Sequence, residues 1–210
     1  MTTERYNLYT YIHKGIRFEL AHLLREAGNL DFADHEAAAA LVARLRLSLQ
    51  LMNEHALHED EFVEPLLQTV APQLARRVAA THQVLESQEH EVLELCNTAP
   101  GNSTAGYKLY LALTRYAATQ FGHMAEEETE IIAALWQHYT DDEIIRAENA
   151  LVASIEPPKA ATYFTWMVPG MNEPERETFL GALRKGAPAE AVAFVEELAR
   201  AAREARLIAA

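Results

Sequence analysis

The sequence has almost no cysteine and no excess of basic residues, and both absences limit what the protein can do. Its one cysteine, Cys96, excludes an internal disulfide framework and is typical of a reducing compartment. Lys and Arg number 18 against 31 Asp and Glu, which gives a formal net charge of -13, and no basic stripe interrupts this acidity. We therefore expect no phosphate-binding surface and no nucleic-acid partner.

Long apolar runs are also missing. No uninterrupted apolar stretch is long enough to span a bilayer, and residues 1–6 lack the charged-then-apolar plan of a signal peptide. The sequence thus predicts a cytoplasmic protein without a membrane partner. What the chain does contain is alanine, leucine and glutamate in abundance, with 50% hydrophobic residues in a length of 210, enough to bury a substantial core.

Hydrophobic periodicity predicts an all-α protein with four long helices and a tail of shorter ones. The expected long helices span residues 3–27, 34–70, 73–95 and 103–139. Asp34 and Ser103 are expected N-caps of the second and fourth. Four long helices with short connections favour an up-down-up-down four-helix bundle over residues 1–140. Residues 141–210 are expected to form a C-terminal helical extension packed on the bundle, with a helix opening at Asn172.

The second predicted helix carries His55 and Glu59, one helical turn apart and on the same stripe as its apolar residues. A buried imidazole beside a buried carboxylate is costly unless a partner satisfies both, and a metal ion is such a partner. The other three long helices carry comparable groups on their inward stripes. These are His13, His82 with Glu86, and His123 with Glu127.

On the third helix the sequence does not decide which residue would bind the metal. Two histidines of this helix lie near the level of the ligands on the other helices. Reflecting the second helix through its connecting loop puts this level between His82 and His90, and reflecting the fourth helix through its loop favours His82 over His90. We expect His82 to be the ligand, with Glu86 and His90 as alternates. His58 lies about 60° around the helix from His55 and is expected to be a flanking residue.

The donor set restricts the metal. Four imidazoles with two or more carboxylates are too many for one tetrahedral zinc with an open position. They suit two first-row metals bridged by carboxylates, most naturally iron. Ferritin-like di-iron bundles use Glu-x-x-His motifs on two helices. Here only Glu19 and His22 have that spacing, and His22 faces away from His13, so a ferritin-like site is not expected.

This pattern resembles the hemerythrin-like, or HHE cation-binding, family over roughly residues 5–140. The likeness includes the segments Ile12–Arg17 and Glu59–Pro65 as well as the histidines. The resemblance implies a four-helix bundle around a non-haem di-iron centre, in which Glu59 and Glu127 are bridging carboxylates. Oxygen-carrying members have two histidines four apart on the third helix. Position 86 is glutamate here, which speaks against simple reversible oxygen carriage.

We therefore expect a non-haem protein with two iron ions that binds dioxygen or a related diatomic such as nitric oxide. Relatives with such a centre act in oxygen carriage, in sensing oxygen, nitric oxide or iron, and in redox protection. One alternative is a redox enzyme that scavenges peroxide or nitric oxide at the same centre. Another is an acidic helical scaffold whose histidines are incidental.

Overall fold

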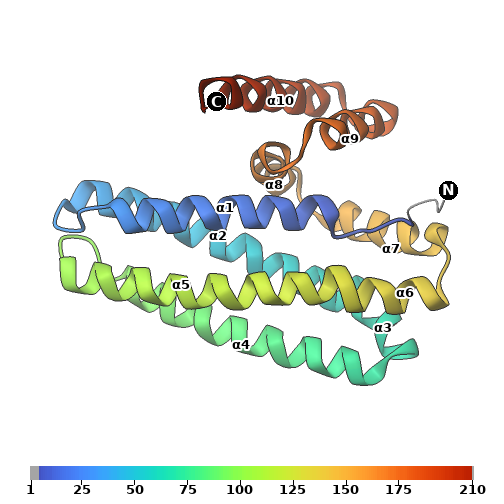
Figure 1. The fold of residues 1–210 in the computed structure, drawn as a ribbon, viewed down its shortest axis with the longest axis horizontal. Helices are drawn as coiled ribbons and strands as arrows, with labels where there is room; N and C mark the ends of the chain where they lie inside the picture. Colours follow the sequence, from blue (N-terminus) through green and yellow to red (C-terminus); the bar gives the residue numbers. More distant parts are fainter. Residues whose placement is uncertain (1–4, 210) are drawn as a thin grey trace. The chain divides into compact units, whose positions relative to one another are not determined.

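Helices make up nearly all of the computed structural model, which describes residues 5–209, with side chains to residue 205 (Figure 1). No strand occurs in this range, which confirms the all-α prediction. Over the same residues, no helix is both long and apolar enough to cross a membrane. In chain order the helices are α1 (Thr10–Asn29), α2 (His35–Phe62), α3 (Glu64–Val70), α4 (Pro72–Cys96), α5 (Ser103–Glu126), the π-helix η1 (Glu127–Ile131), α6 (Ile132–His138), α7 (Asp141–Ser154), α8 (Pro157–Gly170), α9 (Glu173–Gly186) and α10 (Ala189–Ala209).

The chain forms two compact units. The first contains residues 5–8 and 20–154, and the second contains residues 9–19 and 155–209. Helix α7, which follows the expected bundle end at residue 140, belongs to the first unit. It is held there by the chain's N-terminal segment, because Arg5 Nε donates to Asp141 at 2.8 Å and the Tyr6 hydroxyl donates to Glu148.

Helix α1 begins later than the sequence pattern predicts. The expected start at Thr3 lies outside the described residues, and residues 5–9 are not helical. Polar groups of this segment have partners elsewhere in the first unit. Arg5 Nη2 donates to the Tyr139 carbonyl at 2.7 Å, and the Trp136 indole donates to the Tyr6 carbonyl at 2.7 Å. These tertiary hydrogen bonds replace the ones that a longer helix would make.

In the first unit, α4 packs along both α2 and α5 (Figure 1). Asp34 caps α2 as predicted, accepting from the Glu36 and Ala37 amides at 3.1 Å. Helix α5 is capped by Asn102 rather than Ser103, because Asn102 keeps an extended backbone and its side chain accepts from the Ala105 amide. Apolar side chains of these three helices are fully buried, among them Leu45, Leu49, Met52, Val92, Leu109 and Leu113.

Two of the predicted long helices are interrupted. The second breaks at Val63, and the short helix α3 begins directly after it with Pro65 in its first turn. Proline cannot donate the backbone hydrogen bond that a continuous helix needs at that position. The fourth contains η1, in which the Ile132 amide bonds the Glu127 carbonyl five residues earlier. Apolar periodicity does not distinguish this wider turn from ordinary helix.

The second unit is built on a close crossing between the 9–19 segment of α1 and α8. A Cβ atom added at Gly15 would lie 2.9 Å from the Met167 amide nitrogen, and one at Gly170 would lie 2.7 Å from the Lys14 carbonyl oxygen. Only glycine allows such an approach at both positions. Lys14 also pairs with Glu175 at the start of α9. Helices α8 and α9 therefore pack closely against this segment of α1.

The C-terminal helices of the second unit bury one arginine. Arg176 is 2% exposed, donates to the Met171 carbonyl at 2.6 Å and pairs with Glu173 at 2.8 Å. Asn172 and Glu175 form a capping box, which confirms the predicted start of α9. One cluster of buried apolar residues in the same unit consists of Val168, Leu180, Val195 and Ala199.

Candidate metal centre

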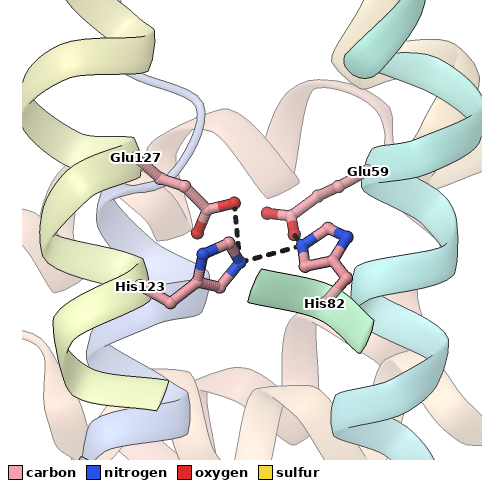
Figure 2. Close-up of side chains that lie close together, drawn as sticks. All are labelled: Glu59, His82, His123 and Glu127. Carbon is pink, nitrogen blue, oxygen red and sulfur yellow. Dashed lines mark hydrogen bonds and ion pairs between the residues drawn. The ribbon is translucent and has the colours of Figure 1, made fainter. Parts of the chain in front are cut away.

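Four potential metal ligands converge in the first unit from α2, α4, α5 and η1. Glu59, His82, His123 and Glu127 each offer one donor atom, and these atoms all lie within 4.8 Å of one another. Figure 2 shows the four side chains turned toward one another. Their side chains are at most 9% exposed. Two imidazoles and two carboxylates therefore share one small, nearly water-free volume.

The individual distances describe how tightly the group is gathered. The Nε2 atoms of His82 and His123 are 2.8 Å apart, and His123 Nε2 lies 3.2 Å from Glu127 Oε1 (Figure 2). His82 Nε2 lies 3.9 Å from Glu59 Oε2. His123 and Glu127 approach each other because they are one helical turn apart. The contact between His82 and His123, in contrast, joins two helices.

A further carboxylate fixes the orientation of His82. Asp60 Oδ1 lies 2.8 Å from His82 Nδ1. An ionised carboxylate only accepts, so Nδ1 carries the proton and Nε2 presents its lone pair to the group. A carboxylate that holds the second nitrogen of a histidine in this way is the usual support of a metal ligand. The sequence analysis did not single out Asp60. Its only signal in the sequence is its position directly after Glu59.

Glu59 faces histidines with both of its oxygens. Its Oε1 lies 3.2 Å from His55 Nε2, and its Oε2 faces His82. His55 is 7% exposed, one helical turn before Glu59 on α2. A carboxylate whose two oxygens point to different imidazoles has the orientation needed to bridge two cations. Of the pair predicted on the second helix, Glu59 already belongs to the group of four. His55 adds one more imidazole beside it.

Three other residues that the sequence analysis named as ligands or alternates are not among the four converging residues of the first unit. His13 belongs to the second unit, where it is fully buried and its ring stacks on Tyr9 with centroids 4.9 Å apart. Its part in a ligand set stays a prediction from the sequence. Glu86 is exposed and is not one of the four converging residues. His90, the alternate, has a side chain 75% exposed beside Glu94.

The π-helix begins at Glu127, one of the four converging residues. It is a single wide turn, in which Thr129 Oγ1 donates to the Ala125 carbonyl at 2.7 Å. Arg77 of α4 pairs with Glu126 and Glu130 on its outer side. Wide turns of this kind interrupt α-helices most often at functional sites, where they redirect a side chain.

A cleft of about 380 Å³ opens in the first unit beside His82. Helix α2 contributes Asp60, α4 contributes Glu86 and Glu89, and α5 contributes Tyr116 to its walls. Burial, and then the charge of Glu86, raises the pKa of Glu89 to about 7. Burial also raises the pKa of Tyr116, so its phenol stays neutral. One member of the converging group is therefore reached from an acidic cleft.

The donor types fit a first-row transition metal. Imidazole nitrogen and carboxylate oxygen suit iron, manganese, cobalt and zinc, and the group contains no thiolate. The one cysteine is not a candidate, because Cys96 is buried and its burial raises the pKa of the thiol to about 11. The group is thus a candidate site for a metal ion held by nitrogen and oxygen.

Comparison with protein-family models, with curated proteins and with solved structures gives no match. The candidate metal centre therefore rests on the residues and the geometry of this chain.

Proposed function

We propose that this protein is a hemerythrin-like, non-haem di-iron protein that binds dioxygen or a related diatomic, and that its long helices form an up-down-up-down four-helix bundle. The observation that carries the proposal is the orientation of Glu59. One of its oxygens faces His55 and the other faces His82, 3.2 Å and 3.9 Å from their Nε2 atoms. A single metal would not need this two-sided arrangement.

In this proposal His82, His123 and Glu127 would hold one ion, and Glu59 together with His55 would contribute to holding a second. The sequence adds His13 to the ligand set as a prediction. Bound iron would supply redox chemistry and an open coordination position for a small ligand. The role of the chain is to fix the ligands and exclude water. Asp60 orients His82, while the burial of Glu59, His123 and Glu127 keeps the site nearly dry.

Metal analysis tests the proposal directly. Protein purified in air after growth with added iron is expected to contain about two irons per chain, as the dinuclear donor set requires. It should also gain a visible charge-transfer absorption on exposure to dioxygen. Far less than one transition metal per chain would overturn the proposal. Steady-state turnover of peroxide or nitric oxide would assign the redox-enzyme role instead.

Two variants locate the iron. Glu59→Gln keeps the size of the side chain but removes the bridging charge, and it is expected to lower the iron content to one ion per chain or less. His90→Ala is the matched control, because His90 is largely exposed on α4. It should retain the wild-type iron content. Equal iron content in Glu59→Gln and the wild type would exclude Glu59 as a bridging ligand.

A further inference from the structure

The residues that line the cleft beside His82 are exposed at one end of the cleft and buried at the other. Leu57 and Glu86 are exposed and mark its mouth, whereas Tyr116 and Gln120, at 2% and 5% exposure, form its floor. His82 lies along its wall with a side chain 9% exposed. The cleft therefore connects solvent with one ligand of the candidate metal centre, without any rearrangement of the helices.

The ionisable side chains that line this cleft carry either a negative charge or no charge. Glu86, Glu89 and Asp60 line the cleft, and no Lys or Arg does so among the described residues. In a narrow space bounded by protein, such charges add up and raise the local concentration of cations. Glu86 also adds to the electrostatic cost of charging Glu89, so a cation beside the two relieves an existing repulsion.

The floor of the cleft also offers an unused polar group. Gln120 lines the cleft, and the part of the chain that the structure describes provides no hydrogen-bond partner for its amide. A hydrated ion or water in the cleft could accept from or donate to this amide. The cleft therefore carries polar side chains at its mouth and at its floor, between apolar ones such as Leu57 and Leu85, and these polar groups suit a hydrated cation better than a neutral diatomic.

We propose that this cleft is the path by which a divalent metal ion reaches the candidate metal centre. Glu86 and Glu89 attract the ion at the mouth, and Asp60 and His82 receive it further in. This inference rests on the proposed function and deepens it, because it assigns to Glu86 a role in metal uptake. As a path residue, Glu86 affects the rate of loading. As a ligand, it would affect the affinity.

The test measures uptake of Co(II) alone by the metal-free full-length chain, followed in a stopped-flow instrument through the visible absorption of the bound ion. The double variant Glu86→Gln/Glu89→Gln is expected to load about tenfold more slowly than the wild type at low salt, with an unchanged equilibrium affinity. Added salt should slow the wild type more than the variant, so that the two rates converge.

The matched control is Glu91→Gln/Glu94→Gln, which makes the same change in charge on the same helix. Neither residue lines the cleft. Glu91 pairs with Arg115 and Glu94 with His90, on exposed surface. Because screening weakens the effect of remote surface charges, this variant should load within about twofold of the wild-type rate. Equal slowing in both double variants would assign the effect to net charge and overturn the path.

The remaining outcomes separate this inference from the proposed function. If the wild type takes up no Co(II), the proposed metal centre itself fails. If the wild type loads and Glu86→Gln/Glu89→Gln loads equally fast, only the path fails. A loss of equilibrium affinity in that variant would make Glu86 or Glu89 a ligand, as the sequence predicted for Glu86, and would also overturn the path.

Discussion

His82 and His123 face each other through their Nε2 atoms at 2.8 Å, although 41 residues separate them in the chain. Because Asp60 holds the proton of His82 on Nδ1, the hydrogen between the two Nε2 atoms must come from His123 when no cation lies there. A metal ion bound by both nitrogens would take the place of this hydrogen, which can move to Nδ1 of the same His123 ring. His82 and His123 can therefore both present Nε2 lone pairs to one cation.

Asp60→Asn tests the orientation of His82. The amide can turn its oxygen toward Nδ1 but lacks the charge that raises the basicity of the ring. We expect metal affinity to fall about 10- to 100-fold, with little change in thermal stability of the metal-free protein. Titration with Co(II) measures the affinity. Glu61→Gln, an exposed neighbour on α2, serves as the control and should bind like the wild type. Unchanged affinity in Asp60→Asn would remove Asp60 from the site.

Metal binding should also stabilise the folded protein. A ligand that binds only the folded state adds about 2.7 kcal/mol at a free concentration 100-fold above its Kd. Differential scanning fluorimetry should therefore show a higher Tm for the wild type when metal is added. His123→Ala should lose this increase, whereas His90→Ala should keep it, because His90 is exposed and pairs with Glu94. The same metal-induced increase in all three proteins would place the metal elsewhere.

Periodicity and cap chemistry predicted the helices because both are local. Asp34 and Asn172 begin helices through hydrogen bonds within three residues of the chain, so the sequence contains everything that defines them. The same holds for His123 and Glu127, whose separation of one turn brings them together on any straight helix. Whether the long helices bind iron stays a prediction.

Contacts between helices could not be read from the sequence in the same way. Asp60 reaches His82 only because α2 and α4 pack in one particular register. The non-helical segment at Arg5 depends on tertiary hydrogen bonds, which leave no periodic signal in the sequence. The crossing at Gly15 and Gly170 likewise becomes visible only when both segments are placed side by side.

The raised pKa of Glu89 predicts a pH dependence of stability. Its pKa rises from an ordinary 4.5 to about 7, chiefly through burial and then through the charge of Glu86. Between these values the folded chain holds a proton that the unfolded chain has lost. The free energy of unfolding must therefore decrease as pH rises from 4.5 to about 7.

Glu89→Gln removes this titration. Because the side chain is only half-buried and partly screened by water, we expect the variant to gain about 1 kcal/mol over the wild type near neutral pH. The gain should vanish at a pH below the ordinary pKa of 4.5, where the wild-type carboxyl is protonated in both states. Urea unfolding across this pH range, with Glu91→Gln as control, measures the difference. Parallel pH profiles for Glu89→Gln and the wild type would contradict the burial of this carboxyl.

The glycine crossing in the second unit predicts a large steric effect. A Cβ at Gly15 would lie 2.9 Å from a backbone nitrogen of α8, and backbone cannot move aside as a flexible side chain can. We expect Gly15→Leu to lower the free energy of unfolding by about 3 kcal/mol or to detach the C-terminal helices from this segment. Limited proteolysis should then cut within residues 155–209.

Gly181→Ala is the control, because no atom lies within 4 Å of its Cβ position. It should stabilise α9 by about 0.5–1 kcal/mol, since alanine loses less backbone entropy than glycine in a helix. Equal protease resistance of Gly15→Leu and the wild type would show that the two segments do not need this close approach.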